Sequence, residues 1–343
     1  MKPIIIGMIT AFLAAVILAP IAAKLSFKVG AVDAPNERKV HSRIMPRLGG
    51  LAIYCGFMAG FIVSGSLRPQ VYGLAHAASM VFLTGFLDDL KGLTPLQKLA
   101  GQFVAAIVFV AFGNVIGFLT NPFTGGIIDL GIFGIPITII WLVGISNAVN
   151  LIDGLDGLAG GVSAISAFTI GIIGLLNQDI VLAVIAMYLT MATCGFLVHN
   201  FPPAKLFMGD CGALFLGFML AALSVMGLSK GATLITLILP IVILGVPIMD
   251  TSFAIIRRAR NKKPIFAADK GHLHHILLQK GYSTRKAVLI IYGLTLFLSF
   301  SAILMVVLTS AQAMIVLAVV AIVVLFLVGG QAVLGRQGRE STP

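Results

Sequence analysis

Four short polar segments of the sequence contain residues that could do chemistry. The first, "GFLDDLKGL" (85–93), has adjacent carboxylates at Asp88 and Asp89. Adjacent carboxylates resist joint ionisation unless a cation lies beside them. The pair therefore indicates either a site for a divalent cation or a phosphate, or a solvated helix end with Lys91 nearby. The residues alone leave both interpretations open.

The second segment, "NAVNLIDGLDGLAGG" (147–161), has Asn147, Asn150 and Asp153 at intervals of three residues. That spacing keeps the three side chains on one face of a helix. Glycines after Asp153 and Asp156 break the helix and let the backbone approach a ligand closely. The set suits a phosphate-bearing, hydroxyl-rich ligand or a hard cation. Helix packing through Asn and Gly is the alternative, but packing does not require two aspartates.

The third segment, "KLFMGDCGALFLG" (205–217), places Asp210 just before a helix expected to begin at Gly212. A carboxylate in that position is either an N-cap or a metal ligand. Phe207 is an aromatic residue on a polar loop, where it could stack on a base or anchor the chain at the membrane interface. Both alternatives stay open for each residue.

The fourth segment, "RRARNKKPIFAADKGHLHH" (257–275), ends in His272, His274 and His275. Three histidines could bind zinc, but no cysteine or fourth ligand lies nearby. The many flanking cations favour phosphate binding by a cationic histidine loop. A generic patch for lipid headgroups is the alternative, and it explains the lysines and arginines but not the histidines.

The rest of the chain must hold these segments at a membrane. Hydrophobic residues make up 59% of the 343 and charged residues only 10%, whereas a soluble domain has about a quarter charged. We therefore expect an all-α integral membrane protein, a polytopic bundle of about eleven transmembrane helices in one domain, 1–343. The apolar runs, each long enough to cross a bilayer, are 3–23, 48–66, 71–87, 98–119, 133–150, 158–176, 180–198, 212–228, 232–256, 286–309 and 312–331. The three cysteines show no metal-type spacing and no disulfide framework.

The basic residues predict that the N-terminus lies outside and the C-terminus in the cytoplasm. In this orientation only Lys2, Arg68 and Lys230 of the 23 lysines and arginines lie outside, as the positive-inside rule requires. The cytoplasmic loops are then 24–47, 88–98, 151–157, 199–211 and 257–285.

The acids of all four segments fall on that same cytoplasmic face, which the positive-inside rule does not explain. A pump or channel would more often place acids at mid-span. Paired acids, an Asn/Asp loop and a cationic histidine loop on one face fit the transfer of a charged phosphoryl group to an acceptor held in the membrane. A transporter or lipid flippase with a cytoplasmic gate is the alternative from another class, and no nucleic-acid partner is expected.

Five ordered motifs, "PRLGG" (46–50), "DDLKGL" (88–93), "NAVNLIDGLDGLAGG", "FMGDCGALFLG" (207–217) and "DKGHLHH" (269–275), resemble the polyprenyl-phosphate N-acetylhexosamine-1-phosphate transferase family, glycosyltransferase family 4. The resemblance covers the whole chain. The "HLHH" motif and the eleventh span resemble the branch that transfers GlcNAc-1-phosphate from UDP-GlcNAc to undecaprenyl phosphate. The sister branch, phospho-N-acetylmuramoyl-pentapeptide transferase, is the alternative.

The resemblance implies roles for individual residues. Asp210 matches the ligand of a Mg²⁺ cofactor, for which Mn²⁺ is the expected substitute, and Phe207 matches the aromatic that packs on uracil. Asp88 and Asp89 match the acidic pair near the lipid phosphate, one of which would deprotonate it. The nucleotide-sugar loop of the family is matched by Asn147, Asn150, Asp153 and Asp156. Its histidine motif near the diphosphate is matched by His272, His274 and His275, and a basic residue near the active site is matched by Arg47.

The resemblance also implies a place and a product. The partners would be UDP-GlcNAc, undecaprenyl phosphate and the lipid bilayer, in a bacterial cytoplasmic membrane with the active site facing the cytoplasm. The product would start a cell-envelope glycan such as teichoic acid or the O-antigen of lipopolysaccharide. The sequence leaves the pathway and a homodimer open.

Overall fold

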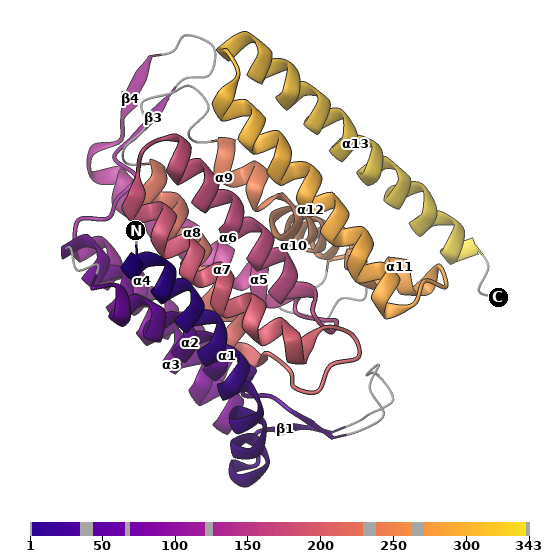
Figure 1. Cartoon of the computed structure of the whole chain (residues 1–343). Coiled ribbons are helices and arrows are strands. Elements are labelled where there is room, and N and C mark those ends of the chain that lie inside the picture. Colours follow the sequence, from indigo (N-terminus) through magenta and orange to yellow (C-terminus); the bar gives the residue numbers. More distant parts are fainter. Residues whose placement is uncertain are drawn as a thin grey trace.

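The computed structural model describes residues 2–34, 44–65, 69–120, 126–228, 238–262 and 271–340. Helices dominate them, and Figure 1 labels each one. They are α1 (Lys2–Val29), α2 (Gly49–Ser64), α3 (Pro69–Lys91), α4 (Pro95–Ala111), α5 (Gly134–Ile152), α6 (Leu158–Leu176), α7 (Ile180–Asn200), α8 (Gly209–Leu228), α9 (Ile238–Ile243), α10 (Gly245–Arg260), α11 (Leu273–Gln279), α12 (Thr284–Val307) and α13 (Ser310–Glu340).

Two short antiparallel strand pairs accompany the bundle. Strand β1 (Val32–Asp33) pairs with β2 (Met45–Pro46), and β3 (Phe118–Thr120) pairs with β4 (Ile127–Asp129), just before the 3-10 turn Gly131–Phe133. The two pairs lie toward opposite ends of the bundle (Figure 1). The expected all-α fold is thus confirmed for the bundle, while the strands occupy two connections between helices.

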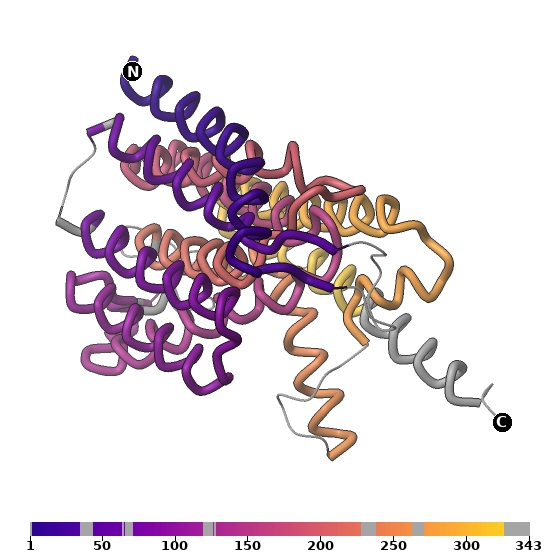
Figure 2. Tube along the Cα trace, turned by 90° about the horizontal axis from the view of Figure 1, so that it is seen from below, coloured from indigo at the N-terminus to yellow at the C-terminus, as the bar shows by residue number. Residues whose placement is uncertain are grey.

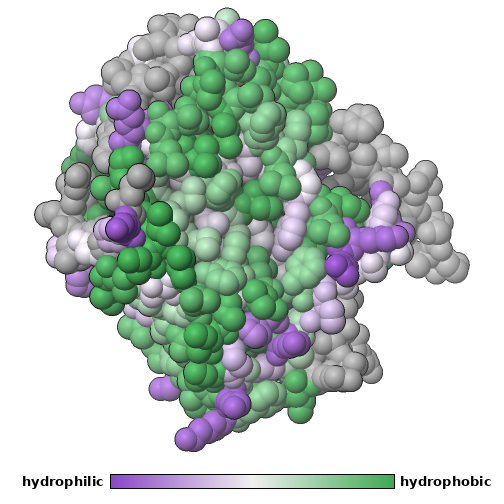
Figure 3. All heavy atoms as spheres, viewed as in Figure 1, coloured by the Kyte–Doolittle hydropathy of each residue, from purple (hydrophilic) through white to green (hydrophobic). Residues whose placement is uncertain are grey.

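Seven helices of the described chain are long and apolar enough to cross a membrane. They cover Lys2–Val29, Val71–Lys91, Gly131–Ile152, Leu158–Leu176, Ile180–Asn200, Gly209–Gly227 and Thr284–Val307. Shorter apolar helices occupy Gly49–Val63, Pro95–Ala111 and Ser310–Leu325. These ten match ten of the eleven expected runs, and apolar side chains cover much of the face seen in Figure 3. The chain is therefore a polytopic membrane protein.

The ninth expected run, 232–256, differs from the prediction. Residues 232–237 lie outside the described part, and the remainder is divided at Leu244 into α9 and α10. Pro247 has no N–H to donate to the carbonyl one turn earlier, and the Ile243 carbonyl instead accepts the Ser166 hydroxyl of α6 at 3.2 Å. The division leaves α10 as a separate helix that carries Asp250 and ends in three arginines.

The most buried helix is α8, with nearly all of its side chains enclosed. It packs on α3 and α5, and also touches α2 and α6. Helix α1 packs on α2 and α7 through a row of buried alanines, Ala11, Ala15, Ala19 and Ala22. Helix α13 lies along α12 at the outside of the bundle (Figures 1 and 2). The start of α8 is consequently held by several helices at once, which fixes the residues around Asp210.

Candidate active site

The loops that precede α2 and α8 bind each other through their backbones. Gly49 N–H donates to the Phe207 carbonyl at 2.9 Å, and Gly50 N–H donates to Met208 at 2.7 Å. Phe207 N–H in turn donates to the Pro46 carbonyl at 2.8 Å. The first N–H groups of a helix have no partner within it, so α2 uses two of them to hold this loop. The "PRLGG" and "FMGD" motifs thus lie side by side.

Two glycines make this close approach possible. A Cβ at Gly50 would collide with the backbone of Gly212 in α8. Gly209 has a φ of +70°, in the left-handed region, and a Cβ there would collide with the Arg47 carbonyl. Only glycine satisfies both conditions without strain. These positions let α8 begin against α2 and against Arg47.

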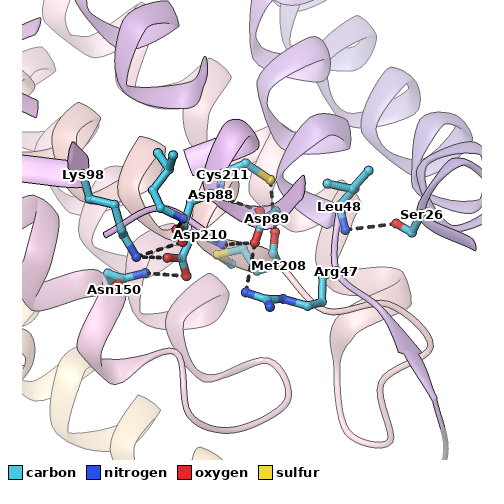
Figure 4. Close-up of polar contacts among 11 residues, drawn as sticks. Ser26, Arg47, Leu48, Asp88, Asp89, Lys98, Asn150, Met208, Asp210 and Cys211 are labelled. Atoms are coloured by element: carbon cyan, nitrogen blue, oxygen red, sulfur yellow. Dashed lines mark hydrogen bonds and ion pairs between the residues drawn. The ribbon is translucent and has the colours of Figure 1, made fainter. Parts of the chain in front are cut away.

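Asp89 fixes the first turn of α8. Its buried carboxylate accepts the N–H groups of Asp210 at 3.0 Å and of Cys211 at 2.9 Å. Arg47 Nη2 binds the same carboxylate at 3.1 Å. Figure 4 shows Arg47 reaching Asp89 from the loop before α2. Asp89 therefore acts as an acceptor for another helix's N-terminus, and Arg47 supplies the compensating charge.

Lys98 lies between Asp88 and Asp210. Its ammonium is 3.0 Å from Asp88 Oδ2 and forms an ion pair with Asp210 Oδ2 (Figure 4). Asn150 Nδ2 donates to the other oxygen of Asp210 at 3.2 Å. Asp88 Oδ1 accepts the Leu93 N–H at 2.7 Å. One cation thus joins carboxylates from two of the predicted motifs.

Asn147 lies one helical turn before Asn150 on α5. Its Nδ2 donates to Gln102 Oε1 at 2.6 Å and to the Val143 carbonyl at 2.8 Å. Lys98 and Gln102 are themselves four residues apart, on one face of α4. The polar faces of α4 and α5 therefore meet beside Asp210, as the spacing of the asparagines predicts for α5.

The loop 153–157 that follows α5 is tied down at both ends. Asp156 Oδ2 accepts the Ala204 N–H at 2.9 Å, and Gly157 N–H donates to Asn200 Oδ1 at 3.0 Å. Asn200, which is buried, also donates to the Leu206 carbonyl at 2.8 Å. This side chain therefore bridges the loop 153–157 and the segment that leads to Asp210.

Asp153 lies among other acids. Burial, and after it the negative charges of Asp210, Asp89 and Asp156, raise the pKa of Asp153 to about 7, while Arg47 opposes them. An added cation would relieve this repulsion. Among the described residues, the acids around this site therefore outnumber the cations Arg47 and Lys98.

The three histidines form a cluster that contacts the loop 153–157 through His274. His272 and His274 are buried with their rings stacked 5.7 Å apart, and the His274 ring lies 4.3 Å from that of His275. His274 also lies against Gly154, where a Cβ would collide with its Nε2. Burial, together with the neighbouring His275, lowers the pKa of His274 to about 4. The His274 imidazole therefore adds no positive charge near neutral pH, and the expected cationic character of this loop rests on its lysines and arginines, of which Lys263 and Lys270 lie outside the described residues.

The structure brings most of the predicted site together. Arg47, Asp88, Asp89, Asn150 and Asp210 form one network, with Asn147 beside it through Gln102. Half-buried Phe207 lies in the loop next to it, and His274 packs against Gly154 of the loop that carries Asp153 and Asp156. Residues 35–43 and 263–270, which belong to two predicted cytoplasmic loops and include Asp269, lie outside the described residues.

The donor set fits a magnesium ion. Within the described ranges, no group of three His, Cys, Asp or Glu side chains is arranged to hold a metal by itself. Mg²⁺, however, usually binds one or two carboxylates and takes its other ligands from water and substrate phosphates. Asp88 and Asp210 already share one cation, the Lys98 ammonium. A divalent ion with this pair and a diphosphate therefore suits the chemistry of the site.

Three residues of this region escaped the sequence analysis. Lys98 counted only as a cytoplasmic charge, although its spacing from Gln102 places both on one face of an apolar helix. Asp250, near the end of an apolar run, binds His272, and polar residues in such runs are a sign of function. Asn200 gave no signal, because its two loop contacts depend on the fold.

Comparison with known proteins identifies a family and several relatives of similar sequence. The sequence profile of "Glycosyl transferase family 4" matches residues 71–228. A Bacillus subtilis protein named probable undecaprenyl-phosphate N-acetylglucosaminyl 1-phosphate transferase is 43% identical over 94% of this chain and 90% of its own length. A Mycolicibacterium smegmatis decaprenyl-phosphate N-acetylglucosaminephosphotransferase is 38% identical over 78% of this chain and 73% of its own. A Yersinia pestis undecaprenyl-phosphate alpha-N-acetylglucosaminyl 1-phosphate transferase is 28% identical, covering 79% and 76%.

Proposed function

The chain belongs to glycosyl transferase family 4, and from that premise we propose that it transfers GlcNAc-1-phosphate from UDP-GlcNAc to undecaprenyl phosphate. The products are GlcNAc-diphospho-undecaprenol and UMP. The observation that carries this proposal is the junction of Asp88, Lys98 and Asp210 at the end of a membrane helix. Charged groups at that depth can meet both a soluble nucleotide sugar and a lipid phosphate.

The reaction breaks one bond and forms another at a single phosphorus atom. An oxygen of the lipid phosphate attacks the β-phosphorus of UDP-GlcNAc, and UMP leaves. The bond between C1 of the sugar and its oxygen is untouched, so the anomeric configuration is retained. The protein must hold two polyanions together, and cations and aligned dipoles around the transferred phosphate supply that stabilisation.

The chain's own residues divide this work. The cations Lys98 and Arg47 lie where phosphate groups would enter the carboxylate network, and Asn150 orients Asp210. Asp88 is the better candidate to accept the proton of the lipid phosphate, since the Asp89 carboxylate is buried and occupied by two backbone N–H groups and Arg47. Phe207 would stack on the uracil, while Asp153, Asp156 and the histidine motif would line the sugar-diphosphate side.

Mg²⁺ held by Asp210, with Asp88 beside it, would neutralise the diphosphate of the nucleotide sugar, and Mn²⁺ would do the same. In the described part of the chain, five acids around this site outnumber the two cations bound among them, Lys98 and Arg47, and this excess of negative charge supports a resident cation.

The proposed orientation in the membrane is based on the distribution of lysines and arginines along the chain. We place the N-terminus outside and the active site at the cytoplasmic surface of a bacterial membrane, where UDP-sugars are made. Relatives from three organisms are named for the transfer of an N-acetylglucosamine phosphate to a polyprenyl phosphate. These names support UDP-GlcNAc as the donor over UDP-MurNAc-pentapeptide. The lipid product would start an envelope glycan such as teichoic acid or O-antigen.

A donor comparison tests the proposal. Purified protein in detergent is given undecaprenyl phosphate and either labelled UDP-GlcNAc or labelled UDP-MurNAc-pentapeptide, with Mg²⁺ or with EDTA. We expect lipid-linked label and UMP from UDP-GlcNAc only, lost in EDTA and restored by Mg²⁺. Efficient transfer from the muramoyl donor alone would assign the chain to the sister reaction, and transfer that persists in EDTA would remove the metal from the proposal.

A further inference from the structure

A buried carboxylate from α10 holds the first residue of the histidine motif. Asp250 Oδ2 lies 2.8 Å from His272 Nδ1, and Asp250 Oδ1 accepts the Leu273 N–H at 2.8 Å. The side chains of both Asp250 and His272 are 7% exposed. Both carboxylate oxygens therefore bind the start of α11, one through a side chain and one through the backbone.

The contact fixes which nitrogen of His272 carries a proton. A carboxylate can only accept, so Nδ1 is the donor in this pair. In a neutral imidazole the other nitrogen, Nε2, then keeps its lone pair. Carboxylates that hold a histidine in this way set its tautomer and its ring orientation. Asp250 thus determines that His272 presents the lone pair of Nε2 to a reacting group.

Capping alone does not account for the arrangement. Helix α11 begins after His272, whose own side chain makes no capping hydrogen bond. Asp, Asn, Ser or Thr at position 272 would cap the helix locally. The chain instead keeps a histidine there and brings the carboxylate from a helix 22 residues earlier. A role limited to stability would not need a histidine at this position.

The pair is linked to the active-site loop. The His272 ring stacks on His274, and His274 packs against Gly154, next to Asp153. A seven-residue helix such as α11 is not stable alone in water, so its position depends on contacts like those of Asp250. A shift of His272 would therefore also move the surface that supports the loop 153–157.

We propose that Asp250 is a positioning residue for the transferase reaction, which acts by holding His272 with Nδ1 protonated and Nε2 available. The inference rests on the proposed function, and it adds to the site a residue that lies outside the five sequence motifs. The same geometry predicts that losing the carboxylate contact with Nδ1 has no further effect on turnover once residue 272 has no imidazole.

The test is a double-mutant cycle of Asp250→Asn and His272→Gln, measured as kcat and KM for UDP-GlcNAc. Asparagine keeps the shape and one acceptor, which still binds the Leu273 N–H, but it presents an amide donor where the second carboxylate oxygen was. We expect kcat to fall about 10- to 100-fold, the scale seen for carboxylates that orient metal-binding histidines, with KM changed by less than about threefold. In the His272→Gln background the Asp250→Asn change should cost less than about twofold.

Controls separate this from a structural effect. Thr251→Val, at the neighbouring position of α10, removes a hydroxyl for which the described residues show no hydrogen-bond partner and should leave kcat unchanged. Thermal unfolding of each variant reports folding. If Asp250→Asn fails to fold, Asp250→Glu replaces it in the cycle, because glutamate displaces the carboxylate by one methylene. The loss of kcat caused by Asp250→Glu must likewise disappear in the His272→Gln background. Equal losses in both backgrounds, or no loss in kcat, would overturn the inference, while wild-type protein that forms no lipid product would overturn the proposed function instead.

Discussion

The Asp89 carboxylate accepts the Asp210 N–H at 3.0 Å, so the end of α3 caps the start of α8. The two members of the acidic pair consequently do different work. Asp89 holds backbone N–H groups and Arg47, while Asp88 shares the Lys98 ammonium with Asp210. Substitution of each should separate a structural loss from a chemical one.

We expect Asp89→Asn to lower the free energy of unfolding by about 1–3 kcal/mol, because its amide places a donor against buried N–H groups. Asp88→Asn should unfold at nearly the wild-type temperature and lose most of its turnover. Thermal unfolding and UMP release, measured on both variants, test the pair. Equal stability losses in the two variants would contradict this division of labour.

The raised pKa of Asp153 predicts a dependence of stability on pH. In the folded protein this carboxyl loses its proton around pH 7, whereas in the unfolded chain it does so near its ordinary pKa of 3.8. The folded state binds the extra proton, so the Asp153 contribution to stability falls as the pH rises from about 4 to 7. Asp153→Asn should therefore be more stable than wild type at pH 8 in metal-free buffer.

The advantage of Asp153→Asn should shrink toward pH 4 and when Mg²⁺ is added, since protons and cations relieve the same repulsion. Melting temperatures at pH 5 and 8, with and without Mg²⁺, measure it. An advantage that is constant across pH would show that the Asp153 charge does not oppose folding.

Phe207→Ala should raise the KM for UDP-GlcNAc by roughly 5- to 150-fold, which corresponds to the ~1–3 kcal/mol of an aromatic–base contact. The backbone contacts of Phe207 to Pro46 and Gly49 do not depend on its ring. Phe207→Trp, which keeps an aromatic face, is the matched control and should stay within a few-fold of wild type. Unchanged nucleotide affinity in the alanine variant would return Phe207 to the role of an interfacial anchor.

The proposed orientation predicts which surfaces are reachable from outside the cell. With the native cysteines replaced, Lys262→Cys at the end of α10 should react with an impermeant maleimide only after the membrane is opened. Ile128→Cys, exposed on β4, should react in intact cells. The reverse pattern would place the site on the outer face.

Much of the site was readable from the sequence because its polar residues interrupt apolar runs. Asn147, Asn150 and Asp153 have helical spacing, and Asp210 follows a left-handed glycine just inside α8. The pairing of "PRLGG" with "FMGD" was not readable, because it depends on backbone contacts between residues far apart in the chain, such as Gly49 and Phe207. The same holds for the contact of Asp250 with His272, and for the break at Leu244, which Pro247 and the distant Ser166 produce together.

The central claim is that a sugar phosphate, and not the sugar alone, moves to the lipid. UDP-GlcNAc labelled with ³²P at the β-phosphate and with ¹⁴C in the sugar tests it most directly, with undecaprenyl phosphate as acceptor and Mg²⁺ present. The account predicts that both labels enter the lipid product in equal amounts while unlabelled UMP is released. Label from the sugar alone in the lipid, with ³²P left in UDP, would contradict it.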